Sequence, residues 1–160
     1  MAAEAGGFAL MVLRVDGEWQ LSPLPEALLD DLDGLLAALR QQSPHEVPLV
    51  LVDVEDEFFV ALRLDGPGEP RVLLSDATAA ADFDLAADVL DMLGEEAPDD
   101  LDEVWPAGDL DLFADLGLSE LELATLLDDL DLYADEMLQA IARRLGFAEA
   151  LAATVDMVPR

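Results

Sequence analysis

The chain has 160 residues, of which 53% are hydrophobic, so it is long enough to bury a core and too apolar to stay disordered. It carries 37 acidic residues against 7 arginines and no lysine, and this net charge of −30 excludes direct binding to nucleic acid or to an anionic membrane surface. Cysteine is absent, which excludes disulfides, thiolate nucleophiles and zinc–sulfur sites.

The first third of the chain predicts a β-hairpin followed by a helix. Residues 8–15 are apolar and rich in β-forming side chains, and Asp16 and Gly17 follow them directly. Asp-Gly between apolar segments is a strong hairpin signal. Ser22 and Pro23 then predict the cap and the first position of a helix. Leucines recur after them at helical spacing: Leu28, Leu32, Leu35 and Leu39.

The next segments predict further strands. Residues 48–54 and 58–64 are apolar, residues 65–70 form a turn with two glycines and two prolines, and residues 71–74 make a short strand. One face of the second segment would carry alternate residues: Phe58, Val60, Leu62 and Leu64. The sequence therefore predicts an α+β fold, with a mainly antiparallel sheet of about five strands and a helix packed on one face.

Helical patterns dominate after residue 76, and they suggest a division of the chain. Residues 1–93 form the predicted α+β domain, whose last part, residues 77–93, is helical. Residues 94–107 read as an acidic linker, residues 108–153 as a small helical subdomain, and residues 154–160 as a tail. Within the helical part, Ser119 with Glu122 forms a capping box, and Gly146 closes a further helix. That helix has an apolar face: Met137, Leu138, Ile141 and Leu145.

Five residues are candidate contacts for a protein partner: Trp105, Asp128, Asp129, Asp131 and Tyr133. Aromatic side chains dominate the energetics of protein interfaces. The two aromatic residues among the five, Trp105 and Tyr133, both lie in acidic segments. Trp105 has an alternative role as an anchor that folds back onto the sheet, and this reading is the favoured one. Trp19, in the hairpin, is expected to be half-buried and structural.

No pattern of residues predicts catalysis, a metal or a cofactor. His45 is the only histidine and lies in a turn between prolines, which favours a surface position. The aspartates at 128–131 and 109–111 lack the glycine and terminal glutamate of a calcium loop, so a diffuse counterion cloud is expected there. Neither a nucleophile elbow nor a glycine-rich phosphate loop is present.

Two stretches resemble known families. The segment FADLGLSELELATLL (113–127) resembles the recognition region of acyl carrier proteins, but Glu120 stands where the modified serine belongs, which favours a chance likeness. Three further segments, PRVLLSDA (70–77), DDLDLY (128–133) and EMLQAIARRLGF (136–147), are similar to the tRNA adenosine deaminase-associated proteins of actinobacteria. That resemblance extends over nearly the whole chain. It implies a link to the deaminase and brings no catalytic residues with it.

The leading hypothesis is therefore a cytoplasmic adaptor or accessory protein that is not an enzyme. Its partner would have a basic surface, and a tRNA adenosine deaminase is the first candidate. One alternative is a small-molecule-binding or carrier domain with a pocket between sheet and helices. Another is a protein whose carboxylates mimic the phosphates of a nucleic acid. The oligomeric state stays open.

Overall fold

The structure is a computed structural model that describes residues 7–64, 70–96, 105–129 and 131–156. The strands are β1 (Gly7–Val15), β2 (Glu18–Pro23), β3 (Leu49–Val54), β4 (Phe58–Arg63), β5 (Arg71–Leu74) and β6 (Ala107–Gly108). The α-helices are α1 (Leu32–Arg40), α2 (Asp84–Leu93), α3 (Glu120–Leu127), α4 (Ala134–Leu145) and α5 (Ala148–Asp156). Short 3₁₀ helices are η2 (Glu26–Asp30), η3 (Pro44–Glu46), η4 (Ala77–Ala81) and η5 (Ala114–Leu116).

In the part of the chain that the structure describes, one antiparallel sheet of six strands runs in the order β2-β1-β3-β4-β5-β6. The β1–β2 hairpin turns at Asp16 and Gly17, whose φ angles are +53° and +83°. Positive φ at both turn residues matches the right-handed twist of the strands, which is why Asp-Gly favours this turn. The predicted hairpin is thereby confirmed.

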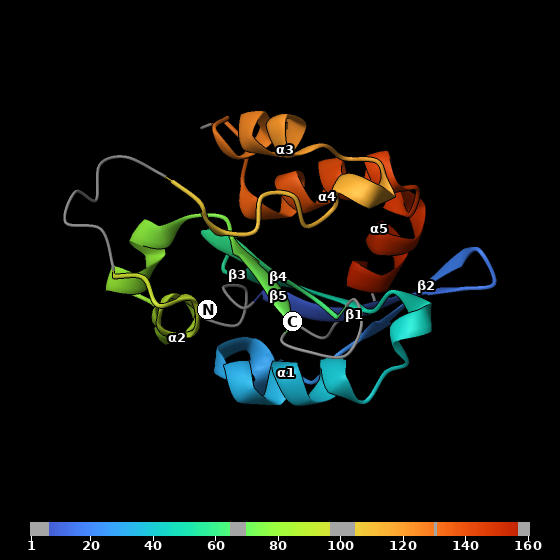
Figure 1. The fold of residues 1–160 in the computed structure, drawn as a ribbon, viewed down its shortest axis with the longest axis horizontal. Coiled ribbons are helices and arrows are strands. Elements are labelled where there is room, and N and C mark those ends of the chain that lie inside the picture. The colour runs from blue at the N-terminus through green and yellow to red at the C-terminus, as the bar shows by residue number, and fades with distance from the viewer. Residues whose placement is uncertain (1–6, 65–69, 97–104, 130, 157–160) are drawn as a thin grey trace.

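Helices cover both faces of the sheet. Figure 1 shows α1 and α2 on one side, and α3, α4 and α5 on the other, with α3 the outermost helix of its layer. The strands β3 and β4 are buried along their whole length. Strands that are apolar on both sides need a cover on both faces, which the two helical layers provide.

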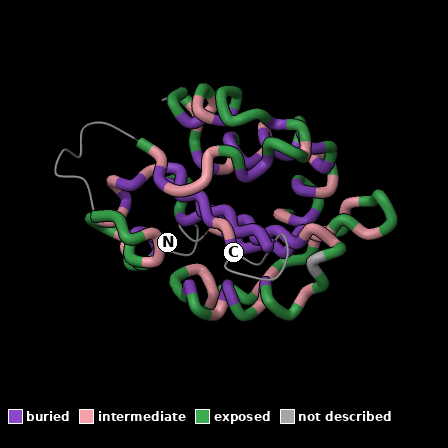
Figure 2. Tube along the Cα trace, viewed as in Figure 1, coloured by how far each residue is buried: buried purple, intermediate pink, exposed green. Residues whose placement is uncertain are grey.

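Alternate residues of each strand feed two hydrophobic cores. On β4, Phe58, Val60 and Leu62 join the core under α1 and α2, together with Leu64 just beyond the strand. Phe59 and Ala61 point the opposite way, into the core under α4 and α5. The predicted common face of the even-numbered residues is confirmed. Figure 2 shows the buried trace running through the sheet between the two layers.

The predicted α+β class and antiparallel sheet are confirmed, and β6 adds one strand to the expected set. The predicted helix start at Ser22 and Pro23 is wrong. Both residues belong to β2, where Pro23 lies opposite Leu10, and α1 begins only at Leu32. Its cap is Asp31, whose carboxylate accepts a hydrogen bond from the N–H of Gly34 at 3.0 Å.

The division of the chain at residues 93 and 108 stays a prediction. Most of the expected acidic linker, residues 97–104, lies outside the described residues, as does most of the turn at 65–70. The helices that follow residue 108 do not stand apart from the sheet. Their buried residues, such as Leu138 and Ile141, share one core with Leu10 of β1 and Leu51 of β3.

Candidate functional site

The loop between α3 and α4 carries Asp128, Asp129, Asp131 and Tyr133 on one exposed stretch. The three aspartates are exposed, and Tyr133 has 67% of its surface accessible. The loop is tightly turned, because the Asp129 carboxylate accepts a hydrogen bond from the backbone N–H of Asp131 at 3.0 Å. The role of these residues as partner contacts stays a prediction.

Trp105 lies elsewhere, two residues before β6. Its carbonyl oxygen accepts a hydrogen bond from the N–H of Ala77 at 2.8 Å, so its main chain is fixed beside η4. The residue nevertheless keeps 40% of its surface accessible. The backbone is thus anchored while the side chain is partly open to solvent. No contact described in the structure joins Trp105 to the α3–α4 loop.

The helix before the loop, α3, has a capped N-terminus. The Ser119 hydroxyl accepts a hydrogen bond from the N–H of Glu122 at 3.2 Å, and the Glu122 carboxylate accepts one from the N–H of Ser119 at 3.4 Å. This confirms the predicted capping box. It also occupies Ser119 with a structural role, while Glu120 is the first residue of α3. The acyl-carrier likeness therefore brings no serine for a prosthetic group.

The β3–β4 turn meets the start of α4 in a group of three aspartates. Asp53, at 2% exposure, accepts a hydrogen bond from the N–H of Asp56 at 3.0 Å. The carbonyl oxygen of Asp56 accepts one from the N–H of Ala134, the first residue of α4, at 3.4 Å. Both turn residues, Glu55 and Asp56, have left-handed backbone with φ near +53° and +59°. The turn therefore positions the helix that Tyr133 precedes.

Burial changes the protonation of these aspartates. It raises the pKa of Asp53 from 3.8 to about 8, and the hydrogen bond and charge of Asp56 add to the effect. Burial and the charge of Asp56 likewise raise the pKa of Asp135 above its ordinary value. At neutral pH Asp53 is thus mostly protonated and can donate its proton to the Asp56 carboxylate. Sequence reasoning missed this group, although an aspartate inside the apolar run PLVLVDV is a signal for it.

Two arginines of the sheet, the buried Arg63 and the half-buried Arg71, pair with carboxylates. Arg63, at 4% exposure, donates to both oxygens of Asp115 at 2.6 and 2.8 Å and to the Leu112 carbonyl at 2.7 Å. This pairing lowers the pKa of Asp115. Arg71 donates to Asp109 at 3.0 Å and to Asp111 at 2.7 Å. Both arginines therefore fasten residues 109–115 to the sheet.

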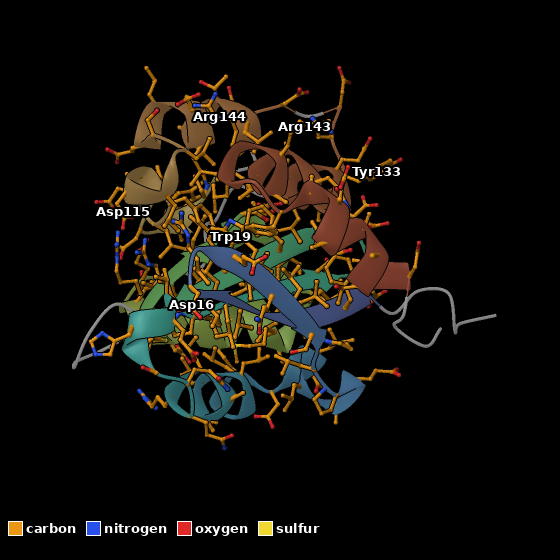
Figure 3. The ribbon with its side chains drawn as sticks, turned by 90° about the vertical axis from the view of Figure 1, so that its right-hand side faces the viewer. Asp16, Trp19, Asp115, Tyr133, Arg143 and Arg144 are labelled. Atoms are coloured by element: carbon orange, nitrogen blue, oxygen red, sulfur yellow. The ribbon has the colours of Figure 1, made fainter. Side chains whose placement is uncertain are left out.

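Further arginines also have partners within the protein. The guanidinium of Arg14 lies 5.3 Å from the centre of the Trp19 ring, a cation–π distance. Arg144 pairs with Glu122 at 2.8 Å and donates to the Gly117 carbonyl at 3.0 Å. Figure 3 shows Arg144 on the outer helical layer and Asp115, the partner of Arg63, lower on the molecule. Arg14, Arg63, Arg71 and Arg144 thus each contact a partner within the protein.

Trp19 has the structural role that its hairpin position predicts. Its indole N–H donates to the Leu145 carbonyl at 3.2 Å, and its ring centre lies 4.9 Å from that of Phe147. Figure 3 shows Trp19 between the hairpin and the helices above it. The residue is half-buried, as expected, and it ties the hairpin to the C-terminal turn of α4.

Comparison with known proteins decides the family. Residues 7–148 match the family model described as Rv3753c-like tRNA adenosine deaminase-associated protein. The chain belongs to this family. It is also 46% identical over 157 residues to Protein Rv3753c of Mycobacterium tuberculosis, with 96% of this chain and 90% of the relative covered. No solved structure matches the chain.

The described part of this Rv3753c-like protein offers no metal centre. Among the residues with described positions, no three histidine, aspartate or glutamate side chains are arranged to hold a metal ion. His45 is exposed in η3, as its place between prolines predicted. A zinc-dependent base deaminase binds its metal through histidine and cysteine, and this chain has no cysteine. Within the described residues, no helix is long and apolar enough to cross a membrane.

Proposed function

We propose that this protein is a non-catalytic accessory factor that binds a tRNA adenosine deaminase through a cationic surface of the enzyme. The observation that carries the proposal is the family match over residues 7–148, whose description names the deaminase as the associated protein. The proposed place of action is the cytoplasm, where tRNA is modified. The absence of cysteine supports a helper role, because the chain lacks the zinc ligands of the enzyme itself.

Charge indicates how such a pair would meet. An enzyme that binds tRNA needs cationic side chains to replace the counterions of the phosphates. This chain has a net charge of −30, and its arginines Arg63, Arg71 and Arg144 are engaged by its own carboxylates. Opposite charges on two proteins speed their encounter and make their association sensitive to salt. A direct role in holding tRNA is disfavoured by the same argument.

The proposal is tested by co-expressing the chain with the tRNA adenosine deaminase of the same organism, followed by size-exclusion chromatography. We expect co-elution at low salt and weaker association as salt rises. Adding tRNA then distinguishes two forms of the complex. Displacement of the acidic protein means that it occupies the tRNA-binding surface, and a ternary complex means that it binds elsewhere. Separate elution at every salt concentration would overturn the proposal.

A further inference from the structure

The outer face of α3 carries an exposed leucine that no part of the described chain covers. Leu123 and Leu127 of α3 point inward and are buried, whereas Leu121 has 77% of its surface accessible. Thr125 lies one turn later on the same face and is also exposed, with its hydroxyl donating to the Leu121 carbonyl at 2.9 Å. Figure 1 shows α3 as the outermost helix on its side of the sheet.

An exposed aromatic residue lies at the other end of the same segment. Tyr133 follows the loop that leaves α3 and has 67% of its surface accessible. Its backbone is held in place, because its N–H donates to the Glu136 carboxylate at 2.9 Å. Figure 3 shows Tyr133 at the outside of the helical layer. Tyrosine is one of the residue types that contribute most to the binding energy of protein interfaces.

The charged residues that lie between Leu121 and Tyr133 in the sequence are all acidic. Asp128, Asp129 and Asp131 are exposed at the C-terminal end of α3, and the last turn of that helix holds no basic residue. The C-terminal end of a helix already carries a partial negative charge, so carboxylates there are unfavourable and cations are favourable. Arg144 pairs with Glu122 in the first turn of α3, at the opposite end of that helix from the three aspartates. No ion pair that the structure describes joins an arginine to Asp128, Asp129 or Asp131.

The arrangement fits a protein surface better than a single ion. The described carboxylates do not converge into a site for a metal ion. A phosphate-bearing ligand would be repelled by the three aspartates. Leu121 and Tyr133 offer apolar contact area, and the three aspartates between them in the sequence offer negative charge. Such a surface is complementary to a partner that carries arginine or lysine residues beside apolar ones.

We propose that the outer face of α3 and the loop after it form a docking surface for a segment of a partner protein that bears arginine or lysine residues. This α3–Tyr133 surface consists of Leu121, Thr125, Asp128, Asp129, Asp131 and Tyr133. Leu121 and Tyr133 bury apolar area against the partner, and the aspartates pair with its cations. The identity of the partner as a deaminase rests on the proposed function, whereas the chemistry of the surface does not.

Two full-length variants and a matched control test the surface. One variant carries Leu121→Ala and Tyr133→Ala, and the other carries Asp128→Asn, Asp129→Asn and Asp131→Asn. These side chains are exposed, so both variants should fold. The control removes the same three charges from the exposed end of α2, on the other side of the sheet, through Asp91→Asn, Glu95→Gln and Glu96→Gln.

The first readout is the Kd for the tRNA adenosine deaminase. We expect each surface variant to raise the Kd about tenfold or more, and the control to change it about twofold or less. A Kd that changes equally in the surface variants and the control overturns the docking surface and leaves the proposed function standing.

The second readout keeps the surface testable if the deaminase does not bind. A synthetic helical peptide of arginine and leucine is titrated into the protein and followed by NMR, where the ring of Tyr133 gives the signals of the only tyrosine in the chain. Shifts confined to α3 and Tyr133 support the surface and point to another partner. Shifts spread evenly over the acidic residues, or none at all, overturn it.

Discussion

Replacing Asp53 with asparagine should stabilise the protein, and the gain should grow with pH. Asp53 is 2% exposed, and its pKa of about 8 lies far above the 3.8 of an ordinary aspartate. The folded protein therefore holds this proton between about pH 4 and pH 8, whereas the unfolded chain has released it. Because the native state binds the extra proton, the free energy of unfolding falls as pH rises through that window. Asparagine has no proton to lose and removes this dependence.

The size of the effect follows from the same pKa values. One pKa unit corresponds to about 1.4 kcal/mol, so the interval from 3.8 to pH 7 corresponds to about 4 kcal/mol at neutral pH. Asparagine preserves the local contacts. Its carbonyl oxygen can accept the N–H of Asp56, and its amide can donate to the Asp56 carboxylate as the protonated acid does.

The assay is urea unfolding followed by tryptophan fluorescence, at several pH values between 5 and about 8. We expect Asp53→Asn to gain about 2 kcal/mol at pH 5 and about 5 kcal/mol near pH 8. The control is Asp88→Asn, the same substitution at an exposed position on α2. If wild type and Asp53→Asn lose stability with rising pH in parallel, the buried proton is not at Asp53 and the reasoning fails.

Four further substitutions test the packing described above, each by urea unfolding. Asp115→Ala leaves the guanidinium of Arg63 buried without its carboxylate and should cost about 1–3 kcal/mol; no loss would mean that the pair is not formed. Gly108→Ala should cost about 3 kcal/mol, because its φ is +98° and a Cβ would meet a β5 carbonyl oxygen. Gly94→Ala, also at positive φ but in open space, should cost only about 1 kcal/mol, and equal losses would contradict the close strand approach. Ser119→Ala should cost about 1 kcal/mol through loss of the cap, and an unchanged midpoint would count against it.

Local signals allowed much of the fold to be predicted. The Asp16-Gly17 turn, the alternating face of β4 and the capping box at Ser119 depend on residues close in sequence, and each is confirmed. The class of fold follows from the order of such elements. The family resemblance, which depends on longer matching segments, is confirmed by the family model over residues 7–148.

Long-range pairing overrode local preference where the predictions are wrong or incomplete. Ser22 and Pro23 are residue types that often begin a helix, yet β2 continues through them. It does so because both residues pair with β1, and the N–H of Leu24 then donates a hydrogen bond to the Ala9 carbonyl. Strand β6 has only two residues, Ala107 and Gly108, which is too short for any sequence pattern. It exists because β5 presents a free edge to it.

The candidate site was predictable only in part. The exposure of Asp128, Asp129, Asp131 and Tyr133 follows from their acidic surroundings. The exposure of Leu121 does not, because a leucine at helical spacing is normally taken to be core. A signal was present: α3 carries Leu121, Leu123, Leu126 and Leu127, more apolar positions than one face of a short helix can bury.

The sheet and the C-terminal helices share one hydrophobic core, so the parts of the chain before and after residues 97–104 each bury apolar residues of the other. A protease that cuts once between residues 97 and 104 should leave two fragments that stay together. Leu10 and Leu51 in one fragment still need Leu138 and Ile141 of the other to exclude solvent. Expressed separately, each half should be insoluble or unfolded, and mixing the two should restore a single cooperative unit. The protein is thus a natural starting point for a split reporter.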